Sequence, residues 1–481
     1  MLGIPAFCAV LVSLLGRWPN IRECVTISSA CALVGVVWPF ALALIEGIEP
    51  RWVIATPLAG VKIVLQAEPL GAVFALVAAT LWIVSSLYSI GYMRGNNEDH
   101  QTRFYACFAI AIASAMGVAM AGNLLTLFIF YEILTLSTYP LVAHHGDEDA
   151  RLGGRTYLMI LLGTSVGLFL LAILWTHSLA GHGEFRPGGI LAGHIEGAMV
   201  AVLLALFVYG IGKAALMPLH RWLPAAMVAP TPVSALLHAV AVVKAGVFCV
   251  TKIVVYVFGL ELLSGEGGAV WLVWIAGMSI VIASSVALKQ DDLKRRLAYS
   301  TVSQLAYVVL AAALLAPLSI MAAVLHIVAH AFGKITLFFA AGSIYTAAHK
   351  TRVSELAGVG WRMPFTMGAF AVASISLIGL PPTAGFISKW YLLSGAGEAG
   401  QPFAIAALVA STALNAAYFL PVVYTAFLKK EAEQESCSAT HGEAPLPMVI
   451  AMVFTAAVTV ALFFWSDVPM ALAVALLTRG L

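Results

Sequence analysis

The stretch YGIGKAALMPLHRWLPAAMVAPTPVSALLHAVAVVKAG, residues 209–246, places basic side chains inside strongly apolar sequence. Lys213 follows an apolar run, and Pro218 then interrupts the helix that this run predicts, because proline removes a backbone donor and clashes with the preceding turn. A second apolar run carries His238 and Lys244. A charged side chain in hydrocarbon costs about 2.5–3.5 kcal/mol even on insertion scales, so such residues usually face a protein interior or a wet cavity. The stretch therefore predicts a buried polar path beside a broken helix.

The composition is that of a polytopic membrane protein. Of the 481 residues, 62% are hydrophobic and only 10% are charged, whereas soluble proteins carry about 25% charged residues. The six cysteines form no C-x-x-C pair, which argues against a zinc or iron–sulfur site. We expect a protein embedded in the lipid bilayer that binds no nucleic acid, metal or cofactor.

Apolar segments long enough to cross a bilayer recur along the whole chain. A span needs about 20 apolar residues at a rise of 1.5 Å each. On that rule the sequence predicts an all-α protein with fourteen helices, near residues 2–16, 24–45, 70–92, 104–121, 124–142, 157–177, 199–216, 232–260, 270–288, 293–314, 318–347, 365–393, 403–428 and 448–465. We expect residues 50–67 to form an extended hairpin outside the bilayer. The short apolar tail, residues 468–477, either prolongs the last helix or lies on the surface.

The Lys and Arg residues predict how these helices are oriented. Sixteen of the 25 lie in loops that follow odd-numbered helices, and four lie in the other loops and the C-terminal tail. Because cytoplasmic loops carry the excess of Lys and Arg, we expect the first set in the cytoplasm and both termini outside, with the chain in a bacterial cytoplasmic (inner) membrane. The other five lie inside predicted helices: Lys213, Lys244, Lys252, Lys334 and Lys389.

One carboxylate, Glu132, falls at mid-membrane depth in the stretch NLLTLFIFYEILTLSTYPLV. Intramembrane carboxylates usually have partners, and Lys213 is the natural one. A nearby lysine lowers a carboxyl pKa and desolvation raises it, so movement of the lysine would change which of the two groups holds a proton. The alternative is a neutral, protonated glutamate without such a role.

The segment HIVAHAFGK carries a second polar signal. A spacing of four residues places His326, His330 and Lys334 along one helix face, about 6 Å apart. Histidine titrates near neutral pH, so this stripe can carry protons by short hops or through water. Two histidines at this spacing also suit a metal, but no third ligand is evident and H-E-x-x-H is absent. His238 alone has a simpler alternative, a core histidine with its hydrogen bonds satisfied.

A second broken helix follows in GLPPTAGFISKW. Pro381 and Pro382 interrupt the predicted twelfth helix, and Lys389 follows within two turns. Helices seven and twelve are thus both broken, both carry a lysine and lie five helices apart. Paired broken segments indicate inverted repeats in transporters. We therefore divide the chain into residues 1–103 (helices one to three), 104–260 and 261–428 (the two five-helix repeats, helices four to eight and nine to thirteen) and 429–481 (a cytoplasmic loop and helix fourteen).

Three further polar groups have simpler interpretations. Lys252 can extend toward an interface. The acids of KQDDLKRR, residues 289–296, suit the start of a helix on a solvated face. The cluster HHGDEDARLGGR, residues 144–155, resembles a loop more than a metal site. Because the chain has no phosphate-binding loop, dinucleotide fingerprint or clear haem ligands, we expect no catalytic site in it, and its status as an enzyme depends on subunits that perform redox chemistry.

Six motifs together resemble a known family. They are NLLTLFIFYEILTLSTYPLV, GKAALMPLHRWLP, APTPVSALLHAVAVVKAG, DDLKRRLAYSTVSQLAY, HIVAHAFGKITLFFAAGSI and GLPPTAGFISKW. They resemble the antiporter-like proton-pumping subunits of respiratory complex I, and equally the large subunits of Mrp-type multisubunit Na⁺(K⁺)/H⁺ antiporters and of membrane-bound hydrogenases. The likeness covers roughly residues 70–430, and length and motif wording are most similar to the D-type subunit of Mrp antiporters.

The resemblance implies two half-channels joined by a central polar axis. By position it implies that Glu132 and Lys213 form a pair between helices five and seven, and that His238 and Lys244 form a bridge on helix eight. His326, His330 and Lys334 then match the stripe of helix eleven, and Lys389 matches the terminal residue on helix twelve. It implies a proton-translocating subunit of a monovalent cation/H⁺ antiporter, working with other membrane subunits and with Na⁺ or K⁺.

Two alternatives stay open at this point. In one, the same machinery belongs to a complex I-like NADH:quinone oxidoreductase or a membrane-bound hydrogenase, whose partner subunits perform the redox chemistry. In the other, the buried polar residues are only scaffold in a structural membrane subunit, an arrangement that the cost of buried charge disfavours.

Overall fold

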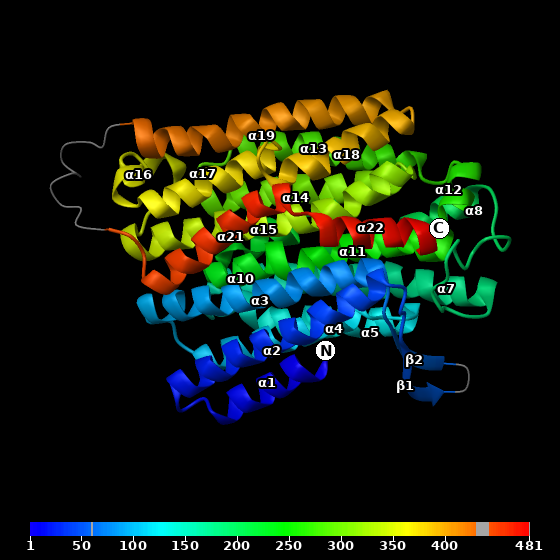
Figure 1. The fold of residues 1–481 in the computed structure, drawn as a ribbon, viewed down its shortest axis with the longest axis horizontal. Helices are drawn as coiled ribbons and strands as arrows, with labels where there is room; N and C mark the ends of the chain where they lie inside the picture. The colour runs from blue at the N-terminus through cyan, green and yellow to red at the C-terminus, as the bar shows by residue number, and fades with distance from the viewer. Residues whose placement is uncertain (59–60, 430–441, 481) are drawn as a thin grey trace.

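Apolar helices packed side by side make up nearly the whole computed structural model, which describes residues 1–58, 61–429 and 442–480 (Figure 1). Over these residues, ten helices are long and apolar enough to cross a membrane. Helix or broken helix occupies all fourteen predicted segments, so the prediction of an all-α polytopic protein is confirmed.

The first third of the chain contains five helices and one hairpin. The helices are α1 (Gly3–Leu14), α2 (Pro19–Ile45), α3 (Pro69–Gly95), α4 (Gln101–Ala119) and α5 (Leu124–Val142), and the strands are β1 (Arg51–Leu58) and β2 (Val61–Gln66). The strands pair antiparallel, with Arg51 opposite Gln66. The predicted extended hairpin at residues 50–67 is therefore confirmed.

The middle of the chain contains the first broken helix. Its elements are α6 (Glu148–Thr164), η1 (Ser165–Phe169), α7 (Leu170–Ala180), α8 (Ala198–Gly210), η2 (Gly212–Ala214), α9 (Trp222–Ala225), η3 (Ala226–Val228), α10 (Thr231–Ala235), η4 (Leu236–Val240), α11 (Val242–Ile253), η5 (Val254–Phe258) and α12 (Leu260–Gly265). The segments η1, η4 and η5 are π-helical turns within longer helices. Such turns are rare and occur often at functional sites.

The last part of the chain contains the second broken helix. Its elements are α13 (Val270–Leu288), α14 (Leu293–Ala313), α15 (Pro317–Ala348), η6 (Val353–Glu355), α16 (Val359–Arg362), α17 (Pro364–Ile378), α18 (Ala384–Glu398), α19 (Pro402–Leu428), α21 (Leu446–Phe464) and α22 (Asp467–Gly480). The chain is interrupted between α8 and α9 and between α17 and α18, as Pro218 and the pair Pro381–Pro382 predict. The apolar tail forms its own helix, α22, which packs against α3 and α15.

The bundle has two distinct ends. The loops after α3, α5, α13 and α15 gather at one end (left in Figure 1). We call it the basic end, because most of the Lys and Arg residues lie in its loops and in the helix ends beside them. The β1–β2 hairpin and the loop between α7 and α8 lie at the other, the hairpin end. Side-chain carboxylates and amides cap helix starts: Asn123, Asp147 and Asp292 each accept a backbone N–H of α5, α6 and α14, satisfying donors that have no partner within a helix.

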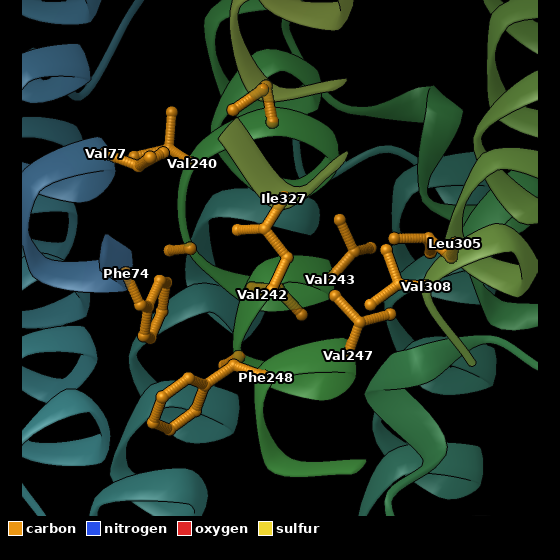
Figure 2. Packing of buried hydrophobic residues seen from close by; sticks show 14 of the residues in the cluster. Phe74, Val77, Val240, Val242, Val243, Val247, Phe248, Leu305, Val308 and Ile327 are labelled. Carbon is orange, nitrogen blue, oxygen red and sulfur yellow. The ribbon is translucent and has the colours of Figure 1, made fainter. Parts of the chain in front are cut away.

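The centre of the bundle is filled by side chains from both predicted repeats. Figure 2 shows Phe74 of α3 and Phe248 of α11 on one side, with Val243 of α11, Leu305 of α14 and Ile327 of α15 close by. Along their most apolar stretches, the helix that comprises α10 to η5 and the helix α15 are entirely buried within the protein. Since both are also surrounded by other helices, their polar residues face protein rather than lipid. The division into four units, residues 1–103, 104–260, 261–428 and 429–481, stays a prediction.

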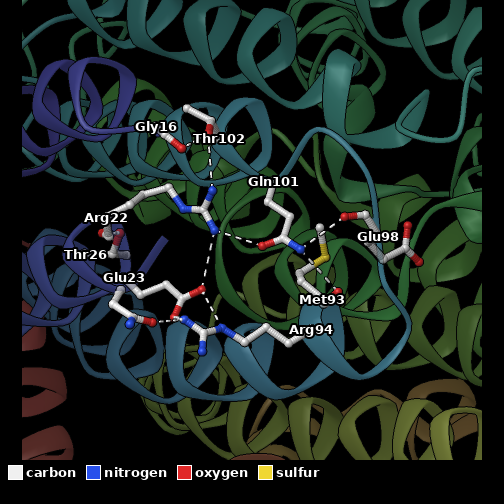
Figure 3. A network of polar contacts seen from close by, with 10 residues as sticks. Gly16, Arg22, Glu23, Thr26, Met93, Arg94, Glu98, Gln101 and Thr102 are labelled. Carbon is white, nitrogen blue, oxygen red and sulfur yellow. Dashed lines mark hydrogen bonds and ion pairs between the residues drawn. The ribbon is translucent and has the colours of Figure 1, made fainter. Parts of the chain in front are cut away.

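A polar network fastens the basic ends of three N-terminal helices (Figure 3). Arg22 donates to Gln101 and Thr102, and Glu23 pairs with Arg94. Arg22 and Glu23 are nearly inaccessible to solvent. Buried charges of this kind are tolerated when they are paired and hydrogen-bonded, so the network holds α2, α3 and α4 in register.

Candidate functional site: a file of buried basic side chains

Lys213 occupies the gap in the first broken helix. Its ammonium nitrogen Nζ donates to the Tyr131 carbonyl oxygen at 2.8 Å and to Thr135 Oγ1 at 2.6 Å, and it lies 3.1 Å from the centroid of the Tyr131 ring. The side chain is fully buried. At the break, the carbonyl of Gly212 accepts hydrogen bonds from Trp222 Nε1 and from the backbone N–H of Ala215, both at 3.0 Å. The gap thus brings a basic group to the face of α5.

Glu132 does not make the direct ion pair with Lys213 that the sequence predicts. Its side chain is half-buried, and neither carboxylate oxygen has a hydrogen-bond partner within the described ranges. The reason is helical geometry: Tyr131 and Thr135, four residues apart, share the face of α5 that meets Lys213, and Glu132 lies about 100° further round. In this arrangement the carboxylate makes no hydrogen bond with Lys213, so any effect that it has on the lysine acts through space.

Lys244 of α11 connects the two halves of the bundle. It is fully buried and its Nζ contacts Nδ1 of His330 on α15. Gly246 permits this placement, because a Cβ there would overlap the backbone of Lys213 and Ala214. The close approach places α11 directly against the gap that holds Lys213.

The predicted stripe on α15 faces the interior along its whole length. His326, His330 and Lys334 are each at most 2% exposed, and the two imidazole centroids lie 6.0 Å apart. His326 Nδ1 is 3.0 Å from Ser388 Oγ, and Lys334 Nζ donates to Ser300 Oγ at 2.6 Å. His326, His330 and Lys334 therefore contact α18, α11 and α14, respectively.

Lys389 lies at the second helix break. Its Nζ donates to the carbonyls of Leu377 and Ile378 at 2.8 and 3.0 Å, which the break before α18 leaves without helical partners. Nζ also lies 4.9 Å from the ring centroid of Tyr307, whose ring stacks on His326 at 5.4 Å. Lys389 lines a cavity of about 510 Å³ together with Tyr307 and Trp390. This arrangement joins the stripe to a hollow at the side of the bundle.

His238 differs from the other histidines. It lies in the π-helical turn η4, is fully buried, and its ring centroid is 4.6 Å from that of Phe338 on α15. Neither ring nitrogen has a hydrogen-bond partner in the described part of the chain. The geometry thus does not support the alternative in which His238 is a core histidine whose hydrogen bonds are made by other protein groups. An unpaired buried imidazole is costly, and ordered water is the usual way to satisfy it.

Sequence reasoning missed a buried ion pair at the hairpin end. Lys252, interpreted above as a side chain extending to an interface, is fully buried, and its Nζ lies 2.6 Å from Glu68 Oε1. Nζ also donates to the Ala121 carbonyl at 2.6 Å and sits 4.4 Å from the Phe185 ring. Glu68 directly precedes α3. The only sequence signal that Lys252 is buried was its position about two turns beyond Lys244.

The alternative of a metal site finds no support in geometry. Among the described residues, no group of three or more His, Cys, Asp or Glu side chains is placed to hold a metal ion. His330 has a lysine amine as its neighbour, and a protonated amine is no metal ligand. The groups that do meet are amines, imidazoles and hydroxyls, which exchange protons.

Comparison with known proteins gives the same assignment by sequence and by fold. Residues 121–415 match the family described as NADH:quinone oxidoreductase/Mrp antiporter, TM. NADH-quinone oxidoreductase subunit N of Desulforudis audaxviator is 35% identical over 89% of this chain and 85% of its own length. The A/B subunit of a probable K⁺/H⁺ antiporter of Rhizobium meliloti is 34% identical over 69% of this chain, which spans only 33% of that longer protein.

Solved structures share the fold at lower identity. A chain of the Mrp complex from Dietzia sp. DQ12-45-1b superposes with a TM-score of 0.87 at 20% identity, covering 99% of this chain and 96% of that one. A chain of the membrane-bound sulfane sulfur reductase, an archaeal respiratory membrane complex, gives 0.86 at 23%, covering 98% and 95%. The resemblance inferred from the six motifs is therefore confirmed. This chain is an integral, multi-pass membrane protein that belongs to the NADH:quinone oxidoreductase/Mrp antiporter transmembrane family.

Proposed function

We propose that this chain translocates protons across the membrane as one subunit of a multisubunit monovalent cation/H⁺ antiporter. The observation that carries the proposal is the file of buried basic side chains that runs from Lys213 by Lys244 and the α15 stripe to Lys389. Buried charges are expensive, and a structural role would be served equally well by apolar residues. Contacts connect the set from Lys244 through the α15 stripe and Tyr307 to Lys389. Helix α11 also packs against the backbone of Lys213 at Gly246. This arrangement favours transport over the scaffold alternative.

Each end of the file has its own part in the proposed path. Glu132 modulates Lys213 through space, and Lys244 transfers the proton to His330 through their direct contact. The proton then moves along the stripe to Lys389 and leaves by the adjoining cavity. Desolvation destabilises the charged form of a buried lysine, so a proton-releasing neutral state is accessible in each turnover. Most Lys and Arg residues lie in the loops of the basic end and in the helix ends beside them, which supports a cytoplasmic location for that end and an outside location for both termini, in a bacterial cytoplasmic membrane.

The partners in this proposal are other membrane subunits. The relatives are named as subunits of antiporters and quinone oxidoreductases, and both solved structures are multisubunit complexes. The Mrp fold match and the K⁺/H⁺ antiporter relative support Na⁺ or K⁺ as the coupled ion. The finer assignment, to the D-type subunit of Mrp antiporters, is a proposal that rests on length and motif wording.

A second candidate function rests on one specific observation. Of the relatives described above, the one that this chain covers most fully in sequence belongs to a quinone oxidoreductase, at 35% identity. In that function the same file serves a redox-driven pump, with the redox chemistry in partner subunits. Purification of the native complex separates the two candidates: iron–sulfur or flavin-containing partners would support the redox pump, and their absence with cation-dependent H⁺ exchange would support the antiporter.

Everted membrane vesicles test the proposed path itself. We expect Lys213→Ala to abolish cation-driven or substrate-driven proton movement while the complex still assembles. Glu132→Ala should lower the rate without abolishing it, because the carboxylate does not touch the lysine. Unchanged transport in both variants would refute the proposed path.

A further inference from the structure

A carboxylate shared by two histidines lies at the basic end, outside the file described above. Glu98, in the loop between α3 and α4, has Oε2 3.3 Å from His145 Nε2 and 3.8 Å from His144 Nε2. The histidines follow α5 directly, so the cluster joins two loops. Figure 3 shows the Glu98 side chain directed away from the network of Arg22, Glu23 and Arg94, so these arginines do not use its charge.

The solvent exposure of the three side chains in this cluster decreases from the surface to the protein interior. The side chain of His145 is 38% exposed, that of Glu98 is 12% exposed, and that of His144 is 2% exposed. Neither ring nitrogen of His144 has a hydrogen-bond partner among the described residues. The imidazole of His145 is therefore in contact with solution and that of His144 with protein, and the Glu98 carboxylate lies between them.

The two imidazoles differ in their affinity for protons. The hydrogen bond with Glu98 raises the pKa of His145 above its ordinary value of 6.5, although burial opposes the shift. Burial lowers the pKa of His144, although Glu98 opposes that shift. Charged groups face the pair from five segments: Glu98 and Asp99 of the α3–α4 loop, Arg103 of α4, Asp147 before α6, Lys294 of α14 and Lys350 after α15. Two phenols, Tyr92 of α3 and Tyr345 of α15, line the same cavity. Of the two imidazoles, His145 thus binds a proton more readily.

A cavity of about 190 Å³ begins at this cluster. Glu98 and His145 line it together with Lys294 and, at its inner side, Thr231. A cavity of that size holds several water molecules, and the polar lining supplies the partners that ordered water needs. The cavity therefore connects the cluster with the first residue of α10.

From Thr231 the polar positions continue inward along one helix face. Thr231, Ser234 and His238 are three and then four residues apart, the spacing that keeps side chains on one face. Ser234 Oγ and both nitrogens of His238 are buried without a partner in the described part of the chain. Phe338, which contacts His238, lies one turn beyond Lys334 on α15. Buried unpaired groups in such a row indicate bound water, which would complete a route to the file.

We propose that Glu98 and His145 form a proton-collecting site that feeds the buried file through this cavity and the Thr231–His238 face. The ligand is a proton from solution at the basic end. His145 binds it at Nε2, Glu98 holds the imidazolium, and the proton passes to cavity water when Lys334 or Lys244 is ready to accept it. This inference rests on the proposed proton-translocating function, and it assigns a role to His145 of the segment at residues 144–155, which the sequence analysis interpreted only as a loop.

The test uses the complete complex in everted vesicles, where the basic end faces the medium in the proposed topology. Glu98→Gln should slow proton transport several-fold and move the alkaline limb of its pH profile to lower pH, because His145 then binds protons less tightly and loses its proton at a lower pH. Imidazole buffer in the medium should restore the rate by replacing the collecting group. Asp149→Asn is the matched control: it removes an exposed carboxylate from the same end of the bundle, and its rate and profile should equal those of the wild type.

His145→Gln provides a second variant in case Glu98→Gln fails to assemble, since the exposed side chain of His145 is easily replaced. It should reproduce both the slower rate and the rescue by imidazole. Wild-type rates and pH profiles in both variants, with transport still lost in Lys244→Met, would overturn this inference and leave the proposed function intact. Unimpaired transport in Lys244→Met would instead overturn the proposed function.

Discussion

The hydrogen bond from Lys213 to Thr135 offers a sharp test of how the first broken helix holds its charge. Thr135→Val keeps the shape of the side chain and removes the hydroxyl that accepts from Nζ at 2.6 Å. The ammonium then keeps one acceptor, the Tyr131 carbonyl. A hydrogen bond to a charged group contributes about 1.5–3 kcal/mol. If protonated Lys213 is required in the slow step, that loss corresponds to a decrease in rate of about tenfold to a hundredfold.

The assay is proton uptake into vesicles that contain the intact complex, followed with a pH-sensitive dye. Thr251→Val is the control, because Thr251 is equally buried but donates only to the Val247 carbonyl of its own helix. We expect it to change the rate less than twofold. A Thr135→Val rate equal to that of Thr251→Val would refute the claim that the hydroxyl stabilises the charged lysine.

Two further substitutions follow from the other buried basic groups. Lys252→Met should destabilise the protein by about 3–5 kcal/mol, because it leaves Glu68 charged and unpaired. Adding Glu68→Gln should recover most of this loss in stability, as measured by thermal unfolding in detergent. A double variant that recovers no stability would contradict the pairing. Gly379→Ala should lower both thermal stability and transport, because residue 379 has a φ of +91° and an added Cβ would lie 2.5 Å from Lys389 Cδ. A variant that unfolds and transports like the wild type would show that the helix break tolerates a side chain at this position.

Much of the fold follows from sequence because each span carries its own signal. Apolar length predicted the spans, and prolines at 218, 381 and 382 predicted the breaks. The α15 stripe was predictable for the same reason, since His326, His330 and Lys334 lie on a single helix and their spacing alone fixes their common face.

Contacts between helices distant in the chain were less predictable. Lys252 and Glu68 belong to separate segments, and no local pattern indicates which buried lysine meets which carboxylate. Glu132 was matched with Lys213 on charge and on the family resemblance, whereas the rotation of α5 presents Tyr131 and Thr135 to the lysine instead. The π-helical turn at His238 has no sequence signature, so the orientation of that imidazole required the structure.

The central claim is that protons cross the membrane through the contact between Lys244 and His330. The most direct measurement is proton translocation by the purified whole complex in proteoliposomes, comparing the wild type with Lys244→Met, which preserves side-chain volume and removes the amine. The account predicts that Lys244→Met abolishes proton translocation although the composition of the complex and its thermal stability are retained. Translocation at the wild-type rate in that variant would contradict it.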